Sequence, residues 1–165
     1  LTTGGGGKSL PEVAQGQVWR LISPIFIHYG VAHLVFNMLW LKDLGSVIEK
    51  IAGTASFLAL VLVSGVASNL GQFAYGGPFF GGMSGVVFGL FGFVWMNMIY
   101  EPGSGLYVSG STILLMIIWL LVCMTGYVGP IANTAHLVGL GTGMSLGYLS
   151  AWANGFGQRP EHEEE

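Results

Sequence analysis

Charged side chains are almost absent from most of this sequence. Between residues 51 and 158 the only Asp, Glu, Lys or Arg is Glu101. A helix needs about 20 predominantly apolar residues to cross a bilayer, and each uncharged block beside Glu101 has room for two such helices. With 52% hydrophobic and 8% charged residues, the composition is not that of an ordinary soluble domain. The sequence therefore predicts an all-α fold, a polytopic transmembrane helix bundle.

Glycine and proline residues divide the apolar sequence into five predicted spans. These cover about residues 31–48, 54–75, 82–98, 111–125 and 134–152, and Gly53 ends the first helix. Before them, Trp19, Phe26 and Tyr29 beside Arg20 favour a segment that lies at headgroup depth. We expect an interfacial segment over residues 1–30, a membrane core over 31–153 and a polar tail over 154–165.

Several classes of site are not supported by the sequence. There is no basic patch for nucleic acid. The single Cys123 has no partner for a disulfide or a thiolate metal site. His28, His33 and His136 are not accompanied by an H-E-x-x-H motif or an intramembrane carboxylate, which argues against a metal. We expect no cofactor, and the sequence leaves the oligomeric state open.

Four polar residues lie at the starts of alternate predicted spans. His33 and Asn37 begin the first span, Ser84 the third and His136 the fifth. Because successive spans run in opposite directions across the membrane, these residues are expected to meet at similar depth on one side.

The distribution of basic residues indicates which side this is. Lys42, Lys50 and Arg159 lie at the opposite helix ends, whereas Lys8 and Arg20 lie on the side of the polar cluster. Since cytoplasmic ends carry the excess of Lys and Arg, we expect the cluster to face the extracytoplasmic side and the C-terminus the cytoplasm.

Ser84 is the predicted nucleophile. It begins a helix within Gly82-Met83-Ser84-Gly85, where unpaired N–H groups and the positive end of the helix dipole would stabilise an oxyanion. The alternative is that these glycines serve helix packing alone.

His136 is the predicted base for this serine, because an imidazole titrates near neutral pH and is costly inside a membrane. Gly139 and Gly143 follow it on a stripe of small residues that would let the helix approach the glycine-bearing face of the serine helix. No Asp or Glu lies at the correct helix ends to orient the imidazole, so a Ser-His dyad is expected. A histidine that only bonds a neighbouring carbonyl is the alternative.

His33 and Asn37, four residues apart, share one helix face. Both can donate hydrogen bonds to a developing oxyanion, together with the Ser84 N–H. Their alternative role is to link helices by hydrogen bonds.

These residues resemble the rhomboid intramembrane serine proteases, of the bacterial GlpG-like type. The matching motifs run in family order from Trp19 to Trp152: Trp19-Arg20, His28, His33 with Asn37, Gly45 to Glu49, Gly82 to Gly85, and Ala135 to Gly139 with Gly143. The resemblance implies that Ser84 is the nucleophile, His136 the general base and acid, and His33, Asn37 and the Ser84 N–H the oxyanion hole. It implies structural or supporting roles for a further set: Arg20, His28, Glu49, Gly82, Gly85, Phe88, Gly139 and Gly143.

Two features depart from the family pattern. Phe88 stands where the family often has Tyr beneath the histidine, so the ring can stack but cannot donate a hydrogen bond. Family members have at least six spans and five are recognisable here, so we expect the first span of the core to be absent from this sequence. We also expect residues 126–133 to form a flexible cap, and Ser68, Gln72 and Asn133 to line a route for water.

The sequence thus predicts a serine endopeptidase that needs no cofactor and cleaves transmembrane segments of other membrane proteins within the lipid bilayer. Two other classes remain open at this stage. A non-catalytic rhomboid-like protein would bind transmembrane clients without cutting them, but such proteins usually lose the serine or the histidine. A small transporter would use His136 as a proton relay, but no inverted repeat is detectable.

Overall fold

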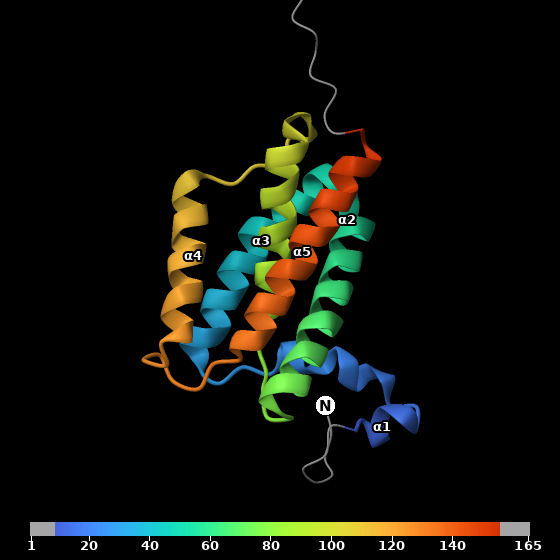
Figure 1. Ribbon diagram of the computed structural model, residues 1–165, viewed down its shortest axis with the longest axis vertical. Helices are drawn as coiled ribbons and strands as arrows, with labels where there is room; N and C mark the ends of the chain where they lie inside the picture. Colours follow the sequence, from blue (N-terminus) through green and yellow to red (C-terminus); the bar gives the residue numbers. More distant parts are fainter. Residues whose placement is uncertain (1–8, 156–165) are drawn as a thin grey trace, which may run out of the picture.

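The computed structural model describes residues 9–155, and all regular elements in that range are helical. In chain order they are α1 (Pro11–Ala14), η1 (Val18–Leu21), η2 (Ser23–Phe26), α2 (Val31–Gly76), α3 (Ser84–Tyr100), η3 (Pro102–Ser104), α4 (Gly110–Met124) and α5 (Asn133–Ala153). The long helices stand side by side as a bundle (Figure 1). This arrangement confirms the predicted all-α helix bundle.

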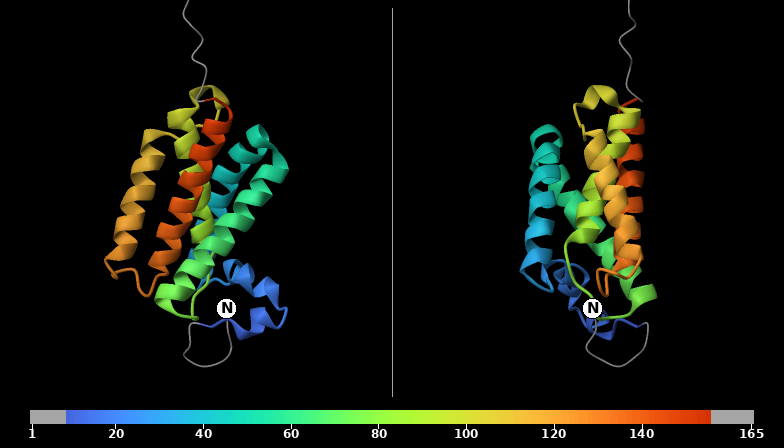
Figure 2. Two further views of the ribbon diagram at one scale, coloured as in Figure 1. Left: turned by 45° about the vertical axis from the view of Figure 1, so that its right-hand side comes forward. Right: turned by 90° about the vertical axis from the view of Figure 1, so that its left-hand side faces the viewer.

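The 46 residues of α2 form two helices joined at Gly53. Gly53 has φ 85° and ψ 160°, a backbone conformation that is open to glycine because it lacks a Cβ atom. The chain reverses direction there, and the two halves of α2 diverge from this point (Figure 2). The predicted break between the first two spans is therefore confirmed, and the five predicted spans correspond to the two halves of α2 and to α3, α4 and α5.

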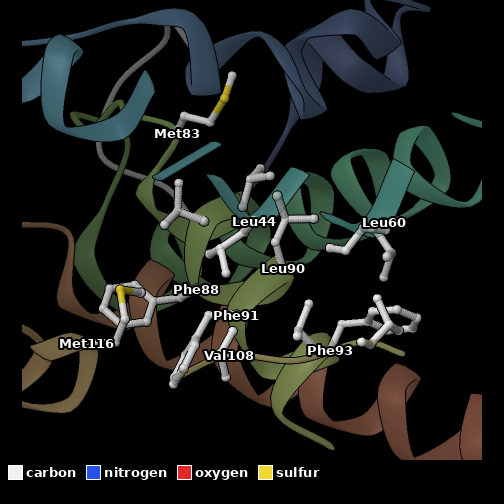
Figure 3. Close-up of a cluster of buried hydrophobic side chains, with 14 of the residues drawn as sticks. Leu44, Leu60, Met83, Phe88, Leu90, Phe91, Phe93, Val108 and Met116 are labelled. Atoms are coloured by element: carbon white, nitrogen blue, oxygen red, sulfur yellow. The ribbon is translucent and has the colours of Figure 1, made fainter. Parts of the chain in front are cut away.

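Helix α3 occupies the centre of the bundle (Figures 1 and 2). Nearly its whole length is buried, because it is apolar on all sides and other helices surround it. Figure 3 shows the side chains of this core. It includes Leu44 and Leu60 from α2, Phe88, Leu90, Phe91 and Phe93 from α3, Val108, and Met116 from α4.

Helix α4 is shorter than a typical transmembrane helix. Its 15 residues extend about 22 Å, compared with about 30 Å for the hydrocarbon core of a bilayer. Among the described residues, α2 alone passes a length and composition test for crossing a membrane, and the apolar helices α3 and α4 are shorter. The predicted bounds were nearly correct, but α3, with 17 residues, and α4, with 15, are shorter than the 20 residues assumed. A bilayer accommodates shorter spans by local thinning.

The segment that precedes α2 lies across the end of the bundle at which α3 and α5 begin (Figures 1 and 2). It is held by hydrogen bonds, since the Asn69 amide donates to the carbonyl of Leu21 at 2.8 Å and Gly82 N–H donates to Pro24 at 3.1 Å. Ile25 is buried in the core, whereas Phe26 is 69% exposed. Apolar exposure of this kind suits the predicted position at headgroup depth.

Candidate active site

Ser84 is the first residue of α3. It follows Gly82, whose φ of 126° lies in the region that favours glycine and lets the chain turn sharply into the helix. The first N–H groups of a helix have no intrahelical acceptor, so the backbone donors nearest the Ser84 hydroxyl remain free for an anion.

His136 lies in the first turn of α5 and its side chain points to Ser84. The distance between His136 Nε2 and Ser84 Oγ is 2.7 Å, a hydrogen bond between residues far apart in the sequence. The imidazole is 2% exposed, and the ring of Phe88 lies beside it with centroids 4.9 Å apart and planes tilted by 38°. The expected hydrogen bond is present, and the Phe88 ring packs against the imidazole in a tilted arrangement where the sequence led us to expect stacking.

Glycine residues bring α3 and α5 together below this pair. A methyl group added at Gly139 would collide with the carbonyl of Gly85, and one added at Gly143 would collide with the carbonyl of Gly89. The contact continues at Gly147, where an added carbon would lie 2.6 Å from the carbonyl oxygen of Phe93. The two helix backbones therefore touch directly, and this contact fixes the separation of Ser84 and His136.

The second imidazole nitrogen of His136, Nδ1, is buried and has no hydrogen-bond partner. A catalytic triad would place a carboxylate at this atom. Within residues 9–155, no group of three or more His, Cys, Asp or Glu side chains is placed to hold a metal ion. The arrangement is that of a two-residue serine and histidine pair.

His33 and Asn37 belong to the first turns of α2, at the end of the bundle where Ser84 lies. A methyl group built on Gly82 would lie 2.9 Å from His33 Nε2 and 3.8 Å from Ser84 Oγ, so the His33 ring lies next to the loop before Ser84. Asn37 is buried, and its amide donates to the carbonyl of His33 at 2.9 Å. The second amide hydrogen of Asn37 is left for another acceptor.

His28 supports the His33 ring from the preceding loop. Their ring centroids are 5.1 Å apart in an edge-on arrangement, and His28 Nδ1 lies 3.2 Å from the carbonyl oxygen of Phe26. The residues that surround Ser84 are thus drawn from the loop before α2, from α2, from α3 and from α5.

The rhomboid domain profile matches residues 15–153, nearly all of the chain that the structure describes. The chain belongs to the rhomboid family. Among curated relatives, the rhomboid protease GlpG of Klebsiella pneumoniae is 37% identical over 136 residues, which is 82% of this chain and 49% of that protein. GlpG of Salmonella paratyphi A is 34% identical over 138 residues, which is 83% of this chain and 50% of that protein. This rhomboid therefore spans about half the length of the curated relatives it matches, and as a family member it is a membrane protein.

Two further predicted residues of this rhomboid, Arg20 and Glu49, form hydrogen bonds with nearby residues of the chain. The Arg20 Nε–H donates to Gln17 at 2.7 Å within the N-terminal segment. Glu49, near the far end of the first half of α2, accepts a hydrogen bond of 2.9 Å from Thr54. Both contacts are local, and the structural role that the family resemblance implies for Arg20 and Glu49 stays a prediction.

The residues proposed for a water route have protein partners in this rhomboid. The Ser68 hydroxyl donates to the carbonyl of Gly65 at 3.1 Å, and the Asn133 amide donates to that of Cys123 at 3.2 Å. Gln72 Oε1 accepts the backbone N–H of Ala135 at 3.1 Å. The water route stays a prediction.

Sequence reasoning missed two features of this site. The acceptor that Gln72 provides to the first turn of α5 has no sequence signal, because the two residues are 63 positions apart. Gly147 did have a signal, since it continues the four-residue spacing of Gly139 and Gly143.

Proposed function

We propose that this rhomboid is an intramembrane serine endopeptidase that hydrolyses peptide bonds in or beside transmembrane segments of other membrane proteins. The observation that carries the proposal is the 2.7 Å approach of Ser84 Oγ to His136 Nε2 at the start of two helices whose backbones touch. The relatives described above are rhomboid proteases, which supports the same class of reaction.

In the proposed reaction, Ser84 attacks the scissile carbonyl carbon of the substrate. A neutral His136 with its proton on Nδ1 accepts the hydroxyl proton at Nε2, and the resulting imidazolium then protonates the leaving amine. Without a third carboxylate, the orientation of the imidazole depends on the packing of Phe88 and on the contact between α3 and α5. Water then attacks the acyl-enzyme, with His136 as the base.

The negative charge on the tetrahedral intermediate needs donors placed in advance. The Ser84 N–H, at the start of α3, is one proposed donor, and the His33 imidazole beside Gly82 is the second. Asn37 lies one helical turn after His33 and is the third, through the amide hydrogen that does not bond His33. No cofactor enters this scheme.

The substrate is proposed to reach the site from the bilayer. We place the site end of the bundle on the extracytoplasmic side, from the excess of basic residues near the other helix ends, and residues 126–133 next to it as a cap. A peptide bond within a helix is shielded by its own hydrogen bonds, so substrate segments with residues that weaken the helix are the expected targets.

A fluorophosphonate probe tests the proposal, because it reacts with an activated serine. The purified rhomboid should be labelled, and Ser84→Ala and His136→Ala should each abolish labelling and cleavage of a transmembrane substrate. Ser145→Ala is the matched control, since this exposed serine bonds only a carbonyl of its own helix. Labelling that persists in Ser84→Ala, or a wild-type protein that is not labelled, would contradict the proposal.

A further inference from the structure

A second hollow in the molecule lies far from Ser84, between the first half of α2 and the segment that leads into α4. It is a cavity of about 170 Å³. Asp43 in its wall is ten residues after His33, which places it about 15 Å further along the helix axis and away from the candidate active site. The lining residues are Trp40, Asp43, Leu44, Val47, Val94, Tyr107, Val108, Ser109 and Thr112.

The lining has an apolar floor and a polar, aromatic rim. Leu44, Val94 and Val108 are buried and form the floor, whereas Tyr107 at the rim is 65% exposed. The contribution of α2 follows from helical spacing, because Trp40 and Asp43 are three residues apart and therefore share one face.

Asp43 is the acidic side chain in the lining of this cavity. It forms no ion pair within the part of the chain that the structure describes. The positions three and four residues away on its helix hold Leu39, Trp40, Ser46 and Val47, so no i,i+4 partner exists either. The Asp43 side chain is exposed, so its carboxylate is accessible to a cation from outside the chain.

The Ser109 and Thr112 hydroxyl groups at the rim are already engaged. Ser109 caps α4: its Oγ accepts the Thr112 N–H at 3.1 Å and lies 2.9 Å from Thr112 Oγ1 and 2.8 Å from Ser111 Oγ. The carboxylate of Asp43 is therefore the charged acceptor that the cavity offers to a ligand, and the rings of Trp40 and Tyr107 lie in the same wall.

We propose that this cavity binds the ammonium headgroup of an aminophospholipid from the leaflet opposite Ser84. A carboxylate beside aromatic rings is the combination that recognises an organic cation, through charge pairing and cation–π attraction. The buried apolar floor suits the carbon atoms of the headgroup. A lipid is favoured over a partner helix because the cavity has the volume of a small group, whereas a helix needs an extended groove.

Binding of short-chain lipids to the purified rhomboid in neutral detergent tests the proposal, with native mass spectrometry as the readout. Dihexanoyl phosphatidylethanolamine should bind more tightly than dihexanoyl phosphatidylglycerol, which has no amine. Asp43→Asn should weaken phosphatidylethanolamine binding by about tenfold and leave phosphatidylglycerol binding unchanged. Tyr107→Leu should weaken phosphatidylethanolamine binding by about threefold. Because Tyr107 is exposed, its replacement should not unfold the protein.

Glu101→Gln is the matched control, because Glu101 lies at the same end of the bundle but outside the cavity. This variant should bind phosphatidylethanolamine as the wild type does. Equal affinity of the wild type for the two lipids, an unchanged affinity in Asp43→Asn, or an equal loss in Glu101→Gln would each overturn the proposal. Asp43→Asn could instead retain lipid binding and cleave substrates that carry lysine beside the transmembrane segment more slowly. That result would show that the carboxylate binds substrates, and it would also overturn the lipid proposal.

Discussion

The contact between α3 and α5 leads to a sharp prediction for Gly139→Ala. The added methyl group would collide with the carbonyl of Gly85, which is rigid backbone and cannot change rotamer. Gly141→Ala is the matched control on the same helix, because an added carbon there meets nothing within 4 Å. The two variants add the same group to the same helix, and only one of them changes the distance between helices.

The size of the effect follows from the distances. At Gly147 an added carbon would lie 2.6 Å from the Phe93 oxygen, whereas ordinary contact begins at 3.4 Å, so relief needs a local separation of about 0.8 Å. The overlap at Gly139 is larger. An extra methyl group in a packed contact costs about 1–3 kcal/mol of stability. The higher helix propensity of alanine than of glycine offsets about 1 kcal/mol of this. With a rigid obstacle, we expect Gly139→Ala to lower the free energy of unfolding by about 2 kcal/mol.

Activity should fall further than stability. The separation needed at Gly139 exceeds the value of about 0.8 Å found for Gly147. It would lengthen the 2.7 Å distance between Ser84 Oγ and His136 Nε2 to about 3.5 Å or more, the outer limit of a hydrogen bond, and a displacement of about 1 Å costs about 100-fold in rate. Equilibrium unfolding in detergent, followed by circular dichroism, and cleavage of a transmembrane substrate measure the two effects. If Gly139→Ala matched Gly141→Ala in both assays, backbone contact would not control the geometry of the pair.

Two further variants examine the surroundings of His136. Gln72→Ala removes the acceptor of the Ala135 N–H, so the free energy of unfolding should fall by about 1 kcal/mol and kcat should drop. Gln72→Glu keeps an acceptor and should retain most of the rate. An unchanged kcat in Gln72→Ala would show that this contact does not contribute to turnover. Phe88→Leu should lower the free energy of unfolding by less than the roughly 3–5 kcal/mol of a Phe→Ala truncation. It should also slow turnover, because the ring beside the imidazole is lost. Turnover equal to wild type in Phe88→Leu would show that the stacked ring does not orient His136.

The sequence allowed the helices and the meeting of Ser84 with His136 to be predicted for a simple reason. Uncharged blocks and glycine punctuation determine where spans begin and end, and alternating direction then decides which helix starts share a side. The meeting of Ser84 and His136 could be predicted without knowledge of side-chain packing. The alternating direction of the helices and the spacing of Gly139 and Gly143 were enough.

Other features depend on contacts between distant segments and have no periodic signal. The bond from the Ala135 N–H to Gln72 requires the end of α2 to lie against the start of α5. The Ser68 hydroxyl, which we predict to line a water route, bonds a carbonyl in the preceding turn, as serine often does in an apolar helix. The cavity at Asp43 combines residues from α2, α3 and the segment before α4, and so it too appears only when the chain is folded.

The reversal at Gly53 makes α2 a hairpin with two arms of nearly equal length. His33 and Gln72 lie almost the same number of residues from Gly53, so each is carried about 30 Å from the bend and both arrive beside the start of α5 or α3. One added or deleted residue in either arm would shift its tip by about 1.5 Å and rotate it by about 100°. The nearly equal length of the two hairpin arms therefore places His33 and Gln72, which are distant in the sequence, at the same depth along the bundle.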